Sequence, residues 1–430
     1  MIVKIKSDNE NLLSILNKNP NTDLGLYLRP LRNGHIIGNC VNENFYEVVF
    51  QDTKHSYTNY EDNQIDFKSY CSPEVILNVL RELFAHLIKD IEEVDKTNIT
   101  WLNSTIGQLD TVPCEIEVEN FMITSNWYKD GEFLLSRYLP NVEVIPTEGF
   151  KIYRLKIVSQ SIVQAINTLG VVSFLTAVTN SRGFYLEDGQ IEKYASILTN
   201  VKTVPYFVYY LYIKRCCIRS NKIFDKISPK LERKFLENNG NKAIFTINDT
   251  HKDRMIFVKS HLDMDKPVIN FGCGEFKHEK YFGKNFKSKL ISYDIDDYSE
   301  LFSKVKERFD FDWEFTTDLS TIDTSLEYQL VLSEVIEHIG SPDKVIEDIF
   351  NLIDHFKINK IILTTPNKDF NKWYEMEEEE VRRDDHIFEF TSDEFKEFCS
   401  KLGSNLNYYC IGDSVNKDCV TLGCVINYEK

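Results

Sequence analysis

The chain has 430 residues, of which 42% are hydrophobic and 27% are charged, and its formal net charge is -17. This length predicts two or three domains with buried cores, and the composition is that of an ordinary globular protein. The negative charge excludes broad, non-specific coating of nucleic acid. Any contact with RNA is therefore expected to use a local basic patch, such as one formed by Lys368, Lys372, Arg382 and Arg383.

Ten cysteines are scattered without the spacing of a zinc site, and the N-terminus has no secretory signal. These features predict reduced thiols in a cytoplasmic protein. The longest apolar run, residues 204–213, is shorter than the roughly 20 residues that a membrane span needs. It is expected to be a core helix or strand rather than a membrane anchor.

The sequence of residues 1–235 predicts an α+β domain, and no catalytic motif is found in it. Residues 45–50 and 151–158 have the pattern of strands, and Ser72 followed by Pro73 is typical of a helix start. A mostly helical stretch is expected from residue 160 to about residue 219. Turn-forming residues gather at 237–241, which predicts a boundary there and a second domain over residues 240–430.

From residue 266 the pattern changes to alternating strands and helices. Strands are expected at 268–271, 290–293, 313–317, from 330 and at 360–365, with two closing strands near 407–411 and 420–428. Helices are expected at 301–309, after Ser341 and Pro342, and from the capping box at Thr391. This alternation predicts a doubly wound, mainly parallel α/β sheet with helices on both faces.

Two carboxylates and an imidazole follow the strand that begins at residue 330. If a helical turn begins there, Glu334, Glu337 and His338 stand at i, i+3 and i+4 and share one face. Such a set suits Mn²⁺ or Mg²⁺ better than a closed zinc site. A fourth ligand is needed from elsewhere, and His386 is the candidate. Taken alone, a string of this kind is also typical of a solvated helix surface.

A short glycine motif follows the first strand of the second domain. Gly272 and Gly274 allow the backbone to turn beneath a ligand without a Cβ in the way. Asp294 lies about 20 residues further on, where an adenosine ribose is held, and Asp318 is placed beside the adenine ring. Either acid can instead be a helix cap or a loop residue. Together they indicate an S-adenosylmethionine pocket rather than an NAD site, because the third glycine is missing.

The motifs of residues 247–430 closely resemble those of the small-RNA 3′-terminal ribose 2′-O-methyltransferase family. The family's Glu-Val-Ile-Glu-His motif is intact at 334–338, its Thr-Pro-Asn motif is matched at 365–371, and its second histidine motif is matched at 382–391. The resemblance implies a class I methyltransferase with a seven-stranded sheet. It also implies that the metal ligands are Glu334, Glu337, His338 and His386, and that Glu337, His338 or His386 relays a proton.

The same resemblance implies a set of cofactor-binding residues. The family's glycine motif is matched at 270–276, with Asn270 in place of an acid and Phe276 in place of the last glycine. An acid there would help to hold the cationic methionine end of the cofactor, so Asn270→Asp is expected to strengthen cofactor binding. The set implied is Arg254, Asn270, Gly272, Gly274, Asp294, Asp318 and Ser333.

The N-terminal half, at residues 13–20 for example, resembles more weakly the bacterial members of this family. Those members carry an additional domain and work with a polynucleotide kinase-phosphatase and an RNA ligase. The resemblance implies that residues 1–235 bind these partners and activate the ligase. The candidate residues of this domain for anchoring a partner protein are Trp101, Trp127, Tyr128 and Tyr185. Each of them can equally be a core residue.

The function implied is metal-dependent transfer of a methyl group from S-adenosylmethionine to the 2′-hydroxyl of the 3′-terminal ribose of RNA. The expected setting is a bacterial RNA-repair complex. Two alternatives stay open. One is a metal-dependent methyltransferase that acts on a small catechol-like molecule. The other is a non-catalytic scaffold of the complex with weakened cofactor binding, which the changes at Asn270 and Phe276 keep open.

Overall fold

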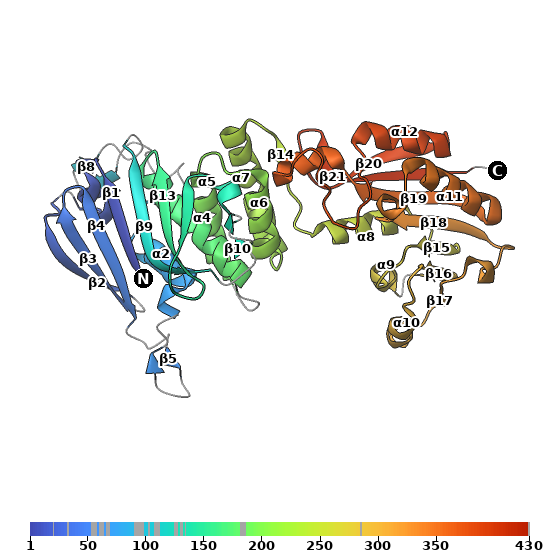
Figure 1. Cartoon of the computed structure of the whole chain (residues 1–430), viewed down its shortest axis with the longest axis horizontal. Helices are drawn as coiled ribbons and strands as arrows, with labels where there is room; N and C mark the ends of the chain where they lie inside the picture. The colour runs from blue at the N-terminus through green and yellow to red at the C-terminus, as the bar shows by residue number, and fades with distance from the viewer. Residues whose placement is uncertain are drawn as a thin grey trace. The chain divides into compact units, whose positions relative to one another are not determined.

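The computed structural model of the chain describes residues 1–19, 21–31, 34–52, 58–59, 64–65, 69–89, 99–101, 104–106, 112–123, 128–129, 132–133, 135–180, 186–283 and 286–428. The chain divides into two compact units, Met1–Gly240 and Asn241–Lys430. Blue to green marks the first unit in Figure 1, and yellow to red marks the second. No helix in the described ranges is long and apolar enough to cross a membrane.

The first unit contains a seven-stranded antiparallel sheet (Figure 1). The strands expected at 45–50 and 151–158 correspond to β4 (Phe45–Asp52) and β13 (Ile152–Ser159), which confirms both predictions. Three further hairpins are formed by β5 (Thr58–Asn59) with β6 (Gln64–Ile65), β7 (Ile99–Trp101) with β8 (Ser104–Ile106), and β10 (Tyr128–Lys129) with β11 (Glu132–Phe133). Across the main sheet the order is β12 (Val142–Pro146), β13 (Ile152–Ser159), β9 (Cys114–Met122), β1 (Ile2–Ser7), β4 (Phe45–Asp52), β3 (Gly34–Asn42) and β2 (Gly25–Leu31).

Helices pack against this sheet and against one another. The central one, α4 (Ile162–Asn180), contacts β9 and β13 as well as α2 (Pro73–Glu82) and α5 (Asp188–Asn200). Its apolar residues extend around the helix, as expected for a helix that is buried on all sides. Ser72 Oγ accepts the Glu74 N–H at 3.3 Å, which confirms the predicted start of α2. The other helical segments are α1 (Leu12–Asn17), η1 (Ser69–Cys71), α3 (Leu135–Tyr138), α6 (Tyr206–Tyr212), the π-helix η2 (Ile213–Cys217) and α7 (Asn221–Asn239).

The boundary between the units is more ordered than its composition predicted. Helix α7 continues to Asn239 and ends at Gly240, whose φ of +70° suits glycine. The side-chain amide of Asn238 donates to the Val201 carbonyl at 3.3 Å, and that of Asn239 donates to the Val204 carbonyl at 3.1 Å. The asparagines therefore form the last turn of a helix, because their amides find acceptors in the first unit.

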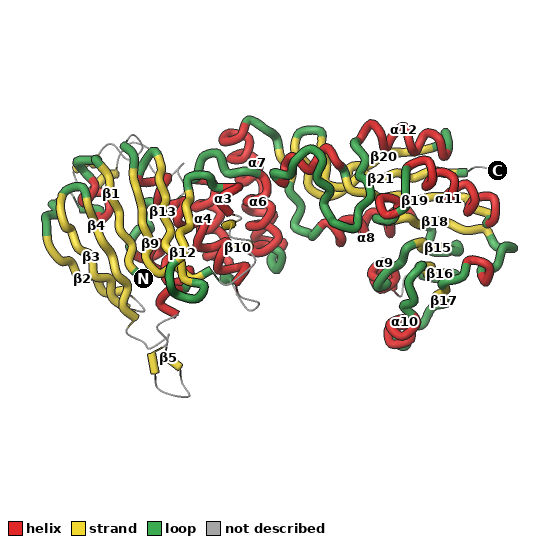
Figure 2. The backbone as a smooth tube through the Cα atoms, in the orientation of Figure 1, coloured by secondary structure: helices red, strands yellow, loops and turns green. Residues whose placement is uncertain are grey.

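The second unit is built on an eight-stranded sheet whose middle strands are parallel, and Figure 2 draws these strands in yellow. Strands β15 to β19 run in parallel, whereas β21 is antiparallel to β19 and β20 is antiparallel to β21. This is the class I methyltransferase topology, extended by the edge strand β14, which was not predicted. In order the strands are β14 (Ala243–Ile244), β20 (Leu406–Val415), β21 (Asp418–Asn427), β19 (Lys357–Pro366), β18 (Glu327–Ser333), β15 (Val268–Phe271), β16 (Leu290–Tyr293) and β17 (Trp313–Thr316).

Helices cover both faces of this sheet, so the doubly wound arrangement is confirmed. Leu330 and Leu332 of β18 pack in one core with α11 (Pro342–His355) and α12 (Ser392–Leu402). Val331 between them packs in a second core with α8 (Thr250–His261), α9 (Lys277–Phe282) and α10 (Ser299–Lys306). Successive strand residues point to opposite faces, which explains why the run is apolar throughout.

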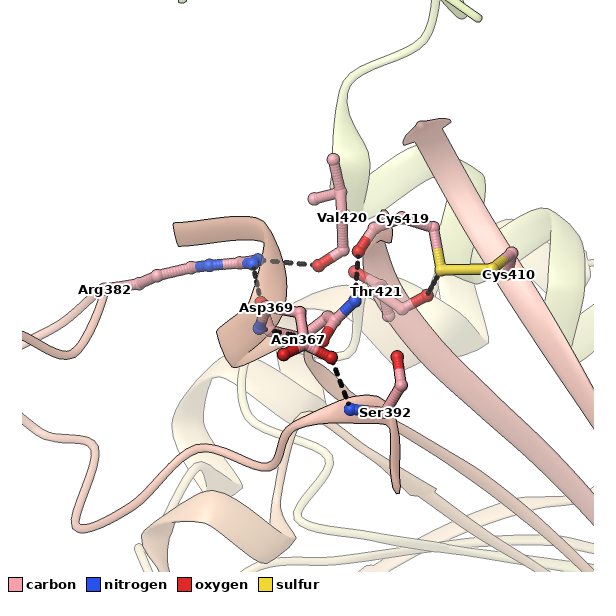
Figure 3. The surroundings of a disulfide bond; sticks show 8 residues. All are labelled: Asn367, Asp369, Arg382, Ser392, Cys410, Cys419, Val420 and Thr421. Carbon is pink, nitrogen blue, oxygen red and sulfur yellow. Dashed lines mark hydrogen bonds between the residues drawn. A yellow bond between two sulfur atoms is a disulfide. The ribbon is translucent and has the colours of Figure 1, made fainter. Parts of the chain in front are cut away.

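One pair of cysteines departs from the expectation of reduced thiols. Cys410 of β20 and Cys419 of β21 form a disulfide (Figure 3). Their Cα atoms lie 5.5 Å apart, a separation that suits a disulfide, although the strand register places Cys410 opposite Leu422 and Cys419 opposite Ser414. The remaining eight cysteines are thiols.

Candidate functional site

The expected metal ligands follow β18, which ends at Ser333. The amide of Glu334 donates to the Thr364 carbonyl of β19 at 2.9 Å, so this residue continues the pairing of the two strands. Its φ of +57° is left-handed, and the 3₁₀ turn η5 (Ile336–His338) begins two residues later. A helical turn does follow the strand, but it begins at Ile336, so the left-handed residue Glu334 lies outside it.

Three of the four expected ligands lie together. Glu337, His338 and His386 each offer one ligand atom within 4.8 Å of the others. The rings of the two histidines meet edge to face, with their centroids 4.9 Å apart. Glu337 is fully buried and His386 is almost so, whereas the His338 side chain is 32% exposed. The group therefore combines two buried ligands with one that solvent can reach.

Glu334 lies outside this group of three. Its Oε2 accepts a hydrogen bond from Arg254 Nη1 at 2.6 Å, and its Oε1 accepts one from Thr364 Oγ1 at 3.3 Å. Both carboxylate oxygens are thus bound by protein donors. A metal bond from Glu334 stays a prediction, and it requires that the contact with Arg254 loosen.

Each histidine of the group is held through one ring nitrogen. His386 Nδ1 lies 2.6 Å from Glu389 Oε1, and Asn371 Nδ2 donates to the second oxygen of Glu389 at 2.7 Å. His338 Nδ1 lies 2.9 Å from the carbonyl oxygen of Asp385. A proton on Nδ1 satisfies these acceptors and leaves Nε2 of each ring available to a ligand. Glu389 was not identified from the sequence, although it lies inside the second histidine motif.

Glu337 has one unsatisfied oxygen. Thr365 Oγ1 donates to its Oε2 at 3.1 Å, but Oε1 is buried without a hydrogen-bond partner in the described structure. Burial, and secondly the negative charge of Glu334, raise the pKa of Glu337 well above its usual value. A divalent cation would provide the missing partner and oppose this rise. The carboxylate and the two imidazoles therefore fit such an ion.

The glycine motif forms a tight turn beside this group. Gly272 and Gly274 have φ values of +74° and +51°, which side chains adopt at a cost. A Cβ on Gly272 would also lie 2.5 Å from Val335 Cγ2. The Gly274 amide donates at 2.8 Å to Asp294 Oδ2, 20 residues later in the chain. The loop and the acid at the end of β16 thus lie together.

The two expected acids have different partners. Asp294 also accepts the Asp296 amide through Oδ1 at 3.1 Å, so its carboxylate holds two loops. Asp318 caps the 3₁₀ turn η4 (Leu319–Thr321), with Oδ1 2.9 Å from the Ser320 amide. In this structure Asp318 is therefore a helix cap, which is one of the two roles that the sequence left open. Contacts of the two acids with a ribose and an adenine stay predictions.

Unsatisfied nitrogen atoms gather around Arg254. Its Nε, together with His251 Nε2 and His278 Nδ1, is buried without a hydrogen-bond partner in the part of the chain that is described. His278 Nε2 lies 3.1 Å from Ser333 Oγ at the end of β18. Burial is the main cause that lowers the pKa of His251 to about 4 and that of His278 to about 3. Orphaned nitrogens of this kind fit an anionic group such as the carboxylate of S-adenosylmethionine. Neither histidine was singled out from the sequence.

The two departures from the family's glycine motif have defined surroundings. Asn270 Nδ2 donates to Glu279 Oε1 of α9 at 2.7 Å. Phe276 has a φ of +58°, which suits the glycine that the motif expects, and its side chain is fully buried. Its ring centroid lies 5.7 Å from that of Phe302 and 5.5 Å from that of Trp313. Aromatic packing therefore offsets the backbone strain at this position.

The expected basic patch is largely paired. Arg382 donates through Nη1 to the Val420 carbonyl at 2.7 Å and through Nη2 to the Asn367 carbonyl (Figure 3). It thereby ties the second histidine motif to β21 and the end of β19, so its role is structural. Two other members of the patch also form ion pairs, Lys372 with Asp418 and Arg383 with Asp385.

The candidate aromatic anchors of the first unit are not described in the structure. Trp127 and Tyr185 lie outside the described residues, and the side chains of Trp101 and Tyr128 are not described. Another apolar surface is found on β2 and β3, where alternate residues of two paired strands share the exposed face. This apolar β2–β3 face comprises Leu24, Leu26, Leu28, Ile37 and Val41, and Leu26 is 76% exposed.

Comparison with known proteins identifies the family to which the first unit belongs. The Hen1 N-terminal domain family matches residues 2–236. The chain belongs to this family. A Hen1-family likeness also extends over the whole chain. A chain in a structure of the Pnkp1/Rnl/Hen1 RNA repair complex is 38% identical, with a TM-score of 0.86 and coverage of 100% of both chains.

Two curated relatives of this Hen1-family chain are named small RNA 2′-O-methyltransferases. The one from Tetrahymena thermophila is 34% identical over 88 residues, which are 19% of this chain and 20% of the relative. The one from Caenorhabditis elegans is 30% identical over 183 residues, with coverage of 35% and 39%. The chain thus covers less than half the length of these curated relatives.

Proposed function

We propose that the second unit transfers a methyl group from S-adenosylmethionine to the 2′-hydroxyl of the 3′-terminal ribose of RNA. The observation that carries this proposal is the convergence of Glu337, His338 and His386 beside the Gly272–Gly274 turn. In an open α/β sheet, ligands bind at the carboxyl ends of the strands, where both features lie. The names of the curated relatives support the choice of RNA as substrate.

The three-residue group would hold a divalent ion, Mn²⁺ or Mg²⁺. When bound, such an ion supplies Lewis acidity to a ribose hydroxyl, which is a poor nucleophile near neutral pH. Oxygen Oε1 of Glu337 and Nε2 of the two histidines are the ligand atoms proposed. The family resemblance implies Glu334 as a fourth ligand. Its carboxylate would have to give up the hydrogen bond from Arg254 at 2.6 Å in order to bind the ion.

The protein residues have separate roles in the proposed reaction. Arg254, His251 and His278 would hold the carboxylate of the cofactor, and the glycine turn would let the backbone approach the cofactor without side chains in the way. Glu337, His338 or His386 would relay the proton that the ribose hydroxyl loses, because all three lie together in the site. Displacement at the methyl group needs alignment of the two reactants more than covalent help from the protein.

We further propose that the first unit binds the other proteins of an RNA-repair complex, a kinase-phosphatase and a ligase. The full-length likeness to a chain of the Pnkp1/Rnl/Hen1 complex supports this assignment. The apolar β2–β3 face is the candidate contact surface, because exposed apolar patches mark sites of association.

The test is a transfer assay with labelled S-adenosylmethionine and the full chain in Mn²⁺. We expect label in a short RNA with free 2′- and 3′-hydroxyls and none in catechol or other small diols. Transfer to the small diols alone would support the small-molecule alternative. Absence of transfer, together with absence of S-adenosylhomocysteine binding, would support the scaffold.

A further inference from the structure

Glu279 of α9 is a fully buried carboxylate. Among the described residues, the partners of its carboxylate are the neutral side chains of Asn270 and Ser292, and it forms no ion pair there. A buried acid without an ion pair is uncommon, because burial favours its neutral form. Burial indeed raises the pKa of Glu279, whereas hydrogen bonds from Asn270 and Ser292 oppose that rise. The sequence gives no reason for an acid on the buried side of this helix.

The hydrogen bonds around Glu279 connect it to three strands of the sheet, two of them directly. Its Oε1 accepts Asn270 Nδ2 of β15 at 2.7 Å and Ser292 Oγ of β16 at 2.6 Å. Trp313 Nε1 of β17 donates in turn to Ser292 Oγ at 2.8 Å. The second oxygen, Oε2, is buried and has no partner in the described structure. A chain of donors thus converges on one oxygen of a single carboxylate.

This arrangement fixes the orientation of the Asn270 amide. A carboxylate only accepts hydrogen bonds, so the NH₂ group of Asn270 must face Glu279. The carbonyl oxygen Oδ1 is then the end of the amide that is turned away from Glu279. Asn270 lies at the carboxyl end of β15, two residues before Gly272, beside the turn proposed to receive the cofactor.

We propose that Glu279 is a positioning residue that provides the negative charge absent at position 270 and presents Asn270 Oδ1 to the ammonium group of the cofactor. The inference rests on the proposed use of S-adenosylmethionine, whose methionine end is cationic. In this chain a buried acid on α9 and a neutral amide on β15 together perform the role of one acid on the strand.

The sequence predicted that an acid at position 270 would strengthen cofactor binding, but the contact with Glu279 reverses this expectation. In Asn270→Asp, a second carboxylate would replace a donor that lies 2.7 Å from Glu279 Oε1. Two carboxylates at that distance cannot both ionise without strong repulsion. The single change is therefore expected to weaken cofactor binding. The double variant Asn270→Asp with Glu279→Gln removes this repulsion, because one acid then faces one amide again, with the two groups exchanged.

Calorimetric titration of S-adenosylhomocysteine into the full chain tests the proposal with three variants. Glu279→Gln, which keeps size and an acceptor but removes the charge, should weaken binding about tenfold or more. Asn270→Asp should also weaken it, and the double variant should bind within about threefold of the unaltered chain. Glu397→Gln, at an exposed acid of α12, is the control and should bind normally.

A merely structural role would move the melting temperature but would not produce rescue by the double variant. If Glu279→Gln does not fold, failure of rescue of Asn270→Asp by a folded double variant overturns the proposal. Unchanged affinity in both single variants overturns it too. Absence of binding by the unaltered chain overturns the proposed function together with this inference, so the two failures are distinguishable.

Discussion

At the scale of single residues, His386 connects the two motifs that form the candidate metal site. Its Nδ1 lies 2.6 Å from Glu389 Oε1, and the Ile387 amide donates to the Glu337 carbonyl at 2.9 Å. The ring is therefore held against the 3₁₀ turn that carries the other two proposed ligands. Loss of the ring removes a ligand without removing the backbone contact.

The change His386→Ala should accordingly abolish Mn²⁺ binding and methyl transfer. Binding of S-adenosylhomocysteine should stay within about threefold, because the proposed cofactor residues lie on other elements. Calorimetry with each ligand and the transfer assay measure these effects. The exposed His355 gives a control, His355→Ala, that should behave as the unaltered chain does. Full activity of the His386→Ala protein in excess chelator would show that this site needs no metal.

The buried histidine His278 makes stability depend on pH. Burial lowers its pKa to about 3, whereas the pKa in the unfolded chain is about 6.5. Below pH 6.5 the unfolded state binds more protons, so the free energy of unfolding falls as the pH drops from about 6.5 toward 3. This residue should contribute a loss of about 1 kcal/mol between pH 6.5 and 5.5.

Chemical denaturation at these two pH values measures the effect. His278→Gln, which does not titrate in this range, should lose about 1 kcal/mol less than the unaltered chain between the two pH values. An equal loss in both proteins would mean that another group controls the acid sensitivity.

Several site residues are predictable because short motifs at strand ends contain them. Glu337, His338 and His386 were identified in this way, as were Gly272 and Gly274. The pairing of Glu334 with Arg254 was not predictable, because it depends on where α8 lies over the sheet. The same holds for His251, His278 and Glu279, whose positions on the buried side of short helices have no sequence signature.

At the scale of elements, the apolar strands of the second unit were the easiest to predict. β15 and β16 have the predicted bounds because each is a short apolar run that ends at polar loop residues. β14 was missed because two residues have no periodicity. α8 was missed because only a few of its residues are buried, among them Phe257 and Val258.

The apolar β2–β3 face carries the prediction at this scale. The double change Leu26→Asp with Leu28→Asp should abolish co-purification of the chain with the proposed ligase or kinase partner. Stability should change by no more than about 0.5 kcal/mol per site, because both side chains are exposed. Pull-down and thermal unfolding measure the two effects. Phe150→Asp, at a residue that is 78% exposed in a turn, is the control. Normal co-purification of the double variant would place the contact elsewhere.

At the scale of the whole molecule, the two compact units suggest separable roles. Every residue proposed for the methyl transfer lies in Asn241–Lys430, whereas the matched family domain lies within Met1–Gly240. A cut after Gly240 should yield a second unit that binds S-adenosylhomocysteine and methylates RNA ends, and a first unit that co-purifies with the proposed repair partners. Transfer assays and pull-downs on the two pieces measure this. If the second unit is inactive alone and the first binds RNA, the first unit is a substrate-binding domain instead.

Methylation of the terminal 2′-hydroxyl removes a vicinal diol, and periodate cleaves only ribose that retains such a diol. The full chain is incubated with S-adenosylmethionine, Mn²⁺ and an RNA that ends in free 2′- and 3′-hydroxyls, and the product is then treated with periodate. The account predicts that the RNA becomes resistant and that the His386→Ala protein leaves it sensitive. Transfer of label to the RNA without resistance to periodate would contradict the account, because the methyl group would then lie elsewhere.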